Sequence, residues 1–233
     1  PKSVVLTDTL DLTNRLFAIS GDFTATGPAA LILSQQAGAQ LSVLGNATFD
    51  GGNQLGSMTN GAVSVAGNFT QLATHSGDSY HPSGAHITVI NSMGSSVISF
   101  ATPGTVPGTS HFQELAIAGS ALDTVTFASD AYAHGNLQQT NADTTFFKSS
   151  DRTFSVGGAL FGPAGVFDNT RLVINGTAAG GTLFLGSVGF RNMNPLATQL
   201  SISEPGSIVP LTLTNATFTT LPTAGGFYIS ATD

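Results

Sequence analysis

Hydrophobic and polar residues alternate in short segments along the chain, and similar segments recur at related spacings. Six segments share the order apolar, any residue, apolar, any residue, glycine, and they span residues 17–21, 41–45, 63–67, 115–119, 154–158 and 172–176. A period of two is typical of a β-strand with one buried face. Each segment therefore predicts a short strand that ends at a bend, where glycine tolerates a positive φ angle.

The spacing of the segments predicts a repeated coil. The glycines that end them are Gly21, Gly45, Gly67, Gly119, Gly158 and Gly176. We interpret the long intervals on either side of Gly119 as doubled periods, and positions 86–91 supply a strand inside the first of them. A repeat of this length cannot bury its apolar side alone, so successive repeats must stack. The chain is predicted to be all-β, a right-handed parallel β-helix (β-solenoid) forming one domain over residues 1–233. An antiparallel β-sandwich with hairpin turns is the alternative.

The composition favours strands over helices and argues against two classes of partner. Only 8% of the residues are charged, which leaves too few Glu, Lys and Arg for the exposed faces of helices. The net charge is −7 and the six basic residues are scattered, so we expect no binding to nucleic acid. The apolar runs are too short for a membrane span. The chain has no cysteine, and no pattern in it predicts a cofactor.

Four phrases between residues 67 and 117 resemble a known repeat. They are GNFTQ at 67–71, PSGAHITV at 82–89, VISF at 97–100 and SHFQELAI at 110–117. Together they resemble the parallel β-helix repeat units of large bacterial surface and secreted proteins, which are adhesin-like. The resemblance implies stacked β-helix coils and an extracellular or cell-surface location. It supplies no catalytic residue that could be transferred to this chain.

Two groups of residues are candidates for a chemical site, and neither matches a known pattern. The densest group of metal-ligand types is His75, Asp78, His81 and His86, whose spacings of 3, 3 and 5 fit no compact zinc motif. We interpret this stretch as a solvent-exposed loop. A polysaccharide-cleaving β-helix needs carboxylates that converge from neighbouring coils, for which the candidates are Asp143, Asp151 and Asp168. No Lys or Arg pair lies near them in sequence, so we expect neither a catalytic nor a metal site.

Polar residues also recur just after three of the glycines. Asp22, Asn46 and Asn68 would lie about 4.8 Å apart in stacked coils, which predicts a hydrogen-bonded stacking ladder. Thr24, Thr48 and Thr70 follow at the same spacing. A regular threonine array is what an ice-binding solenoid would need, but this row is predicted to end at the third coil.

Strand-like sequence at both ends predicts self-association, because neither end shows a helix or polar loop that would cap the sheet edges. The residues concerned are Val4, Val5, Leu6, Leu10, Leu12, Phe227, Tyr228 and Ile229. We expect an extracellular structural protein that assembles head to tail into a filament or sheath, or an adhesive surface module. A polysaccharide-binding or polysaccharide-cleaving β-helix is the alternative. The expected partners are further copies of the chain and, as a second candidate, extracellular polysaccharide.

The two ends can also be read as the ends of a fragment that continues into more solenoid in a longer adhesin. The chain begins with Pro1 where an initiator Met would stand, which we expect of a processed or excised chain.

Overall fold

A computed structural model describes residues 2–119, 123–139 and 152–158 of the chain, together with strand residues between and beyond these ranges. Side chains are described for residues 2–119, 123–138 and 152–158, and the remaining strands are described by their backbone. The described part contains strands and turns but no helix long and apolar enough to cross a membrane.

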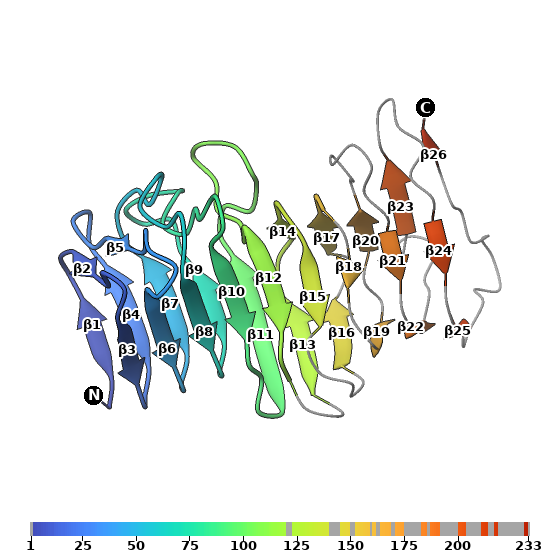
Figure 1. Cartoon of the computed structure of the whole chain (residues 1–233), viewed down its shortest axis with the longest axis horizontal. Coiled ribbons are helices and arrows are strands. Elements are labelled where there is room, and N and C mark those ends of the chain that lie inside the picture. Colours follow the sequence, from blue (N-terminus) through green and yellow to red (C-terminus); the bar gives the residue numbers. More distant parts are fainter. Residues whose placement is uncertain are drawn as a thin grey trace.

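The longest sheet has ten strands (Figure 1). Its strands in order are β1 Val4–Leu6, β4 Phe23–Thr26, β7 Ala47–Asp50, β9 Phe69–Gln71, β11 Ser95–Phe100, β13 Thr124–Phe127, β16 Thr145–Ser149, β19 Ala164–Asp168, β22 Ser187–Arg191 and β25 Thr217–Phe218. The strand order skips members of the other sheets, so the chain leaves this sheet and returns to it once in every coil.

The other sides of the coils are built from four further sheets. A seven-stranded sheet holds β3 Leu16–Ile19, β6 Gln40–Val43, β8 Ala62–Val65, β10 Ile87–Ile90, β12 Glu114–Ile117, β15 Leu137–Gln139 and β18 Leu160–Phe161. A five-stranded sheet holds β14 Ala131–Ala133, β17 Thr153–Val156, β20 Arg171–Ile174, β23 Leu200–Ser203 and β26 Ala231–Thr232. The two-stranded sheets are β2 Leu10–Asp11 with β5 Ile32–Leu33, and β21 Leu183–Leu185 with β24 Leu211–Leu213.

Pairings between the described strands are parallel, from Val4 opposite Phe23 at the start to Ile202 opposite Ala231 near the end. This confirms the predicted β-solenoid and excludes the antiparallel sandwich for the described strands. We number the coils by their strands. Coil 1 holds β1 to β3, coil 2 holds β4 to β6, coil 3 holds β7 and β8, coil 4 holds β9 and β10, coil 5 holds β11 and β12, and coil 6 holds β13 to β15.

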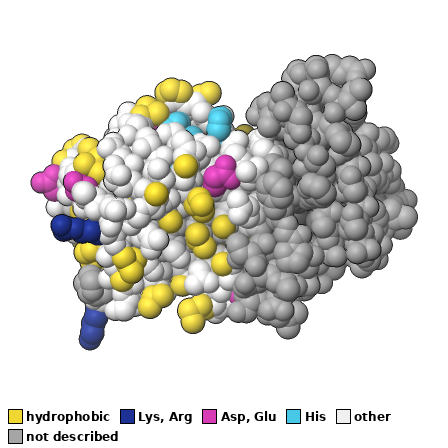
Figure 2. Space-filling view, viewed as in Figure 1, with side chains coloured by type: hydrophobic (Ala, Val, Ile, Leu, Met, Phe, Trp, Pro, Cys, Tyr) yellow, Lys and Arg dark blue, Asp and Glu magenta, His cyan; other side chains and the backbone are white. Residues whose placement is uncertain are grey.

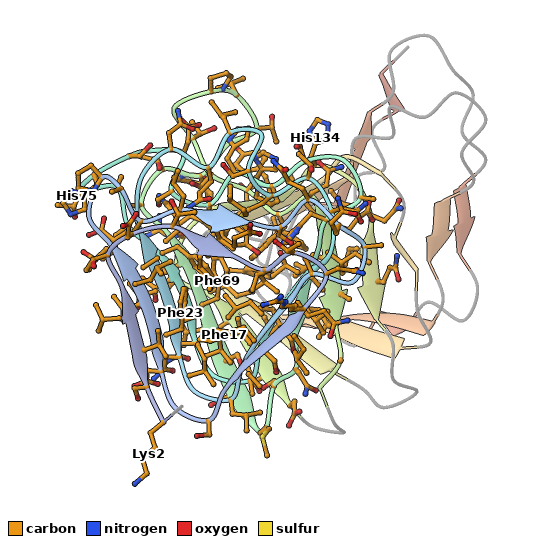
Figure 3. The ribbon with its side chains drawn as sticks, turned by 60° about the vertical axis from the view of Figure 1, so that its left-hand side comes forward. Lys2, Phe17, Phe23, Phe69, His75 and His134 are labelled. Atoms are coloured by element: carbon orange, nitrogen blue, oxygen red, sulfur yellow. The ribbon has the colours of Figure 1, made fainter. Side chains whose placement is uncertain are left out.

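The core is a column of side chains between the sheets. Inward positions alternate in size along the stack, as where Phe23, Ala47 and Phe69 lie opposite one another in successive coils. The small side chain leaves room for the ring of Phe49, whose centroid lies 5.8 Å from that of Phe23 and 5.1 Å from that of Phe69. Figure 3 shows Phe23 and Phe69 inside the coils. Burying one such ring contributes about 1.5–3 kcal/mol to stability.

Most of the expected strands are present, but the six glycine-ended segments do not share one side of the solenoid. The first four form β3, β6, β8 and β12 of the seven-stranded sheet, whereas the last two form β17 and β20 of the five-stranded sheet. The interval from Gly119 to Gly158 is therefore a change of side and not a doubled period. The interval from Gly67 to Gly119 is a true double, because the expected strand at 86–91 is present as β10 between β8 and β12.

The glycines at the ends of these strands also serve a different purpose from the predicted one. Positive φ angles occur at other glycines, such as Gly84 and Gly94, and not at Gly45 or Gly67. A Cβ atom on Gly67 would lie 2.7 Å from the carbonyl oxygen of Gly45 in the coil before it. Glycine is needed because the backbones of successive coils approach closely at this turn.

Candidate functional site

Coil 1 lies at one end of the described stack. Among the described strands, β1, β2 and β3 are each the outermost strand of their sheet. The N–H groups of Val4 and Leu10 donate to carbonyl oxygens of coil 2, at Asp22 (2.9 Å) and Leu31 (2.8 Å). Because the backbone groups of neighbouring residues in a strand point to opposite sides, Val5 directs its N–H and C=O groups toward the open edge.

The predicted self-association residues at the start of the chain cover the end of the core only in part. Val4, Leu6 and Leu10 are partly buried against the core, as is Phe17, while Leu12 is fully buried. Val5 is 67% exposed on the outside of the sheet. The apolar interior therefore extends to the outermost described coil. Figure 3 shows Phe17 and Phe23 close to this end. The partners predicted at the other end of the chain, Phe227 to Ile229, lie outside the described residues.

Asp22, Asn46 and Asn68 lie one above another at the turn that leads into the ten-stranded sheet. The Asp22 carboxylate accepts a hydrogen bond from the Asn46 N–H (2.7 Å), and the Asn46 side-chain oxygen accepts one from the Asn68 N–H (2.9 Å). The Asn68 side-chain oxygen accepts the next bond, from the Val97 N–H (2.9 Å). Each rung joins a side chain to the backbone of the next coil, so a shift in register would break it.

A row of hydroxyl side chains lies on the outside of the ten-stranded sheet. Thr24 is opposite Thr48, Thr48 is opposite Thr70, and Thr70 is opposite Ser99 in coil 5. The sequence predicted that the row ends at Thr70, because the long segment between β9 and β11 hides the next member. Figure 2 shows few charged side chains on the visible face of the described residues, where hydrophobic side chains are scattered.

The predicted exposed loop around Asp78 is in fact largely buried. Asp78 and His81 are only 6% and 7% exposed, and His86 is fully buried. The reason is that residues 72–86 fold against residues 101–113 of the next coil, where the Asp78 carboxylate accepts a hydrogen bond from the Gly108 N–H (2.7 Å).

The four residues of this stretch do not converge on one point. Asp78 lies 3.2 Å from Nδ1 of His81, whereas Nδ1 of His86 contacts the Asn60 carbonyl oxygen (2.9 Å). His75 lies apart at the edge of the loops (Figure 3). In the part of the chain with described side chains, no group of three or more His, Asp or Glu residues could hold a metal ion.

Two histidines that the sequence did not single out adjoin this stretch. The His111 ring lies 4.3 Å from the His81 ring and 5.8 Å from the His134 ring, measured between centroids. Burial, together with smaller contributions from His81 and His134, lowers the pKa of His111 to about 4. Burial likewise lowers the pKa of His86 to about 4 and raises the pKa of Tyr80. Both His111 and His86 are therefore held in the neutral form at pH 7.

Gln71 is the second feature that the sequence analysis missed. It is fully buried at an inward position of β9, and its side chain donates to the Leu72 carbonyl oxygen (2.6 Å) and to Ser79 Oγ (2.9 Å). Its Oε1 accepts hydrogen bonds from the N–H groups of Ala101 (3.0 Å) and Thr102 (3.2 Å). The signal available in the sequence was an amide two residues after Phe69, where the period of two requires an inward side chain.

The carboxylates considered for polysaccharide cleavage cannot be placed together. Asp143 and Asp151 lie outside the described residues, and Asp168 is in β19, which is described by its backbone. The chain matches no protein family model, and comparison with curated proteins and with solved structures found no match. The geometry of coil 1, the outer face and the loops is therefore the basis for assigning a function.

Proposed function

We propose that the chain is an extracellular structural protein whose solenoid is lengthened by a second copy that adds to coil 1, head to tail. The observation that carries the proposal is that β1, β2 and β3 are the outermost described strands of their sheets. These three strands have the same parallel arrangement as the strands inside the stack. Partly buried apolar side chains lie between their edges. Unpaired edges of this kind are templates for further strand pairing.

A second copy is the occupant that best fits the shape of this end. A parallel edge must be met by the opposite edge of another parallel coil, with strands at matching corners. At the far end of the chain, β25 is the outermost described strand of the ten-stranded sheet that begins with β1, so its edge corresponds to the edge of β1. A contact between the two different ends of identical molecules is heterologous and does not close, so it produces a filament.

The proposal is tested by sedimentation velocity and electron microscopy of the purified chain over a concentration series. We expect elongated particles that lengthen with concentration. Val5→Pro removes an N–H group that faces the open edge, and it should shorten or abolish the particles. Val5→Thr is the matched control, because it changes the same side chain and keeps the N–H group. Monomers at every concentration, or equal assembly of both variants, would refute pairing at this edge.

A second candidate is adhesion to polysaccharide through the outer face of the ten-stranded sheet. The row from Thr24 to Ser99 offers hydroxyl groups at a regular spacing of about 4.8 Å, set by the distance between strands. Binding to insoluble polysaccharides, measured by co-sedimentation, should be lost in Thr48→Arg. It should be retained in Ser42→Arg, which lies on an outward position of the seven-stranded sheet. Equal binding of both variants would exclude this face as the binding surface.

A further inference from the structure

Three imidazole rings from successive coils form a row beside the long loops. His81 belongs to the loop of coil 4, His111 to the loop of coil 5, and His134 follows β14 in coil 6. Their centroids are 4.3 Å apart for the first pair and 5.8 Å for the second. His81 and His111 are buried and His134 is exposed, so solvent reaches the row from one end only.

The row lies where the two loops are joined to each other. His111 donates its backbone N–H to the Tyr80 carbonyl oxygen (3.1 Å). Nδ1 of His81 lies 2.6 Å from the Thr109 carbonyl oxygen and 3.2 Å from the Asp78 carboxylate. Both neighbours are acceptors, so Nδ1 of His81 carries a proton and donates. The loop of coil 5 is therefore held to the loop of coil 4 by contacts made within and beside the histidine row.

The surroundings of the His111 ring disfavour a positive charge on it. His111 is buried, and its Nδ1 has no hydrogen-bond partner. Burial is the largest effect that disfavours a proton on His111, and the interactions with His81 and His134 add to it, whereas hydrogen bonding to the backbone of Gly104 and Pro82 favours the proton. The carboxylates nearby are already engaged, Asp78 with the Gly108 N–H and Glu114 with the Asn136 N–H.

We propose that His81, His111 and His134 form an acid-sensitive latch, which holds the loops at 72–86 and 101–113 together at neutral pH and releases them when His111 takes up a proton. Protonation of a buried histidine beside other histidines is a known way to separate packed surfaces, because it adds uncompensated charge where none can be solvated. Opening of the loops uncovers Tyr80 and Phe112, which pack in the core, and it breaks the pairing of Phe112 with Ala133 of β14.

The direction of the effect follows from linkage. In the closed state the pKa of His111 is about 4, and in an open loop it returns to the ordinary value of about 6.5. The open state therefore binds more protons between these values, and the closed state is destabilised as the pH falls from 6.5 toward 4. A shift of this size makes opening about thirtyfold easier at pH 5 than at pH 7.5.

Hydrogen exchange of the backbone amides tests the latch. After correction for the pH dependence of intrinsic exchange, we expect amides in 101–113 to lose about thirtyfold protection between pH 7.5 and pH 5. His111→Phe preserves a buried ring that cannot titrate, and its loss should stay below about threefold. His75→Gln is the matched control, because it removes a histidine of the same loop that lies outside the row, and it should respond as the parent chain does.

Two results would overturn the latch. One is loop protection that does not change with pH in the parent chain, and the other is an equal loss in His111→Phe. If His111→Phe does not fold, the titration of the His111 imidazole by NMR in the unmodified chain decides the question. An apparent pKa of His111 near 6.5 in the folded protein would contradict a closed state in which its ring is neutral.

Discussion

Replacing Gln71 with methionine should test whether buried polar contacts, and not only apolar stacking, hold the two long loops to the solenoid. Methionine has a similar length and volume, so the substitution removes polar atoms without opening a large cavity. The Gln71 side chain contacts the backbone of its own coil at Leu72 and the loop residue Ser79, and it also reaches Ala101 and Thr102 in coil 5. One side chain therefore joins two coils and both loops.

The magnitude follows from the groups that are left without a partner. The Thr102 N–H bonds to Oε1 of Gln71 and would lose its acceptor, whereas the Leu72 carbonyl oxygen keeps a bond from Ser79 Oγ (2.6 Å). An unsatisfied donor costs about 1–3 kcal/mol when buried, and each further hydrogen bond lost costs about 0.5–1.5 kcal/mol. Because Thr102 is partly exposed, we expect Gln71→Met to lower the free energy of unfolding by about 2 kcal/mol.

Equilibrium unfolding in urea, followed by far-ultraviolet circular dichroism, measures this change. Thr70→Ala is the matched control, because Thr70 is the neighbouring outward residue and its substitution should change the free energy of unfolding by less than about 0.5 kcal/mol. Gln71→Glu keeps an acceptor for the coil 5 amides but buries a charge, so it should be at least as harmful as methionine. If Gln71→Met is as stable as Thr70→Ala, the hydrogen bonds around Gln71 contribute nothing to holding the loops.

Three further outcomes follow from the described contacts. Gly67→Ala should destabilise the chain by about 1–3 kcal/mol in the same urea assay, because its Cβ would lie 2.7 Å from the Gly45 carbonyl oxygen; Ser64→Ala, on the outside of the adjacent strand, is its control. Asn68→Ala should cost about 0.5–1 kcal/mol by removing the acceptor for the Val97 N–H, and Asn68→Asp should restore most of this loss. Stability should fall as the pH drops from 6.5 toward 4, because folded His86 has a pKa of about 4, and His86→Gln should remove about 2 kcal/mol of the fall between pH 7 and pH 5.

The sequence carried enough information to predict the strands and their stacking, because both depend on neighbouring residues. Alternation around Phe17 or Val63 marks an inward face directly, and the spacing of Gly21, Gly45 and Gly67 reports the length of a coil. The signal failed where a segment with the same pattern lay on another side of the solenoid, as at Phe154 in β17. Alternation of apolar and polar residues shows that a strand has a buried face, but it does not show which sheet the strand joins.

The polar contacts of the loops were beyond prediction for a different reason. The residues that meet there are far apart in sequence, such as Gln71 with Thr102, or His81 with His111. Whether such residues touch depends on loop conformation, which repeats in no other coil that the structure describes. The stretch from His75 to His86 therefore resembled an exposed loop in composition, although its polar side chains are largely buried against the next coil.

The difference in length between the short turns and the long loops of the solenoid has a physical cause. Three turns are short and equal in length, namely those from β3 to β4, from β6 to β7 and from β8 to β9. The segments on the other side are several times longer and differ from one another in length; they lead from β7 to β8, from β9 to β10 and from β11 to β12. The short turns contain the close-packed glycines and the ladder of Asp22, Asn46 and Asn68, so an insertion there would break a rung and separate two backbones. The long loops are joined to neighbouring described coils by individual contacts, such as the hydrogen bond from the Thr74 N–H to the Asp50 carboxylate (2.9 Å), and the entropic cost of a longer loop is small. A β-solenoid of this kind can therefore keep one side in strict register for stacking while it gains buried polar clusters on the other.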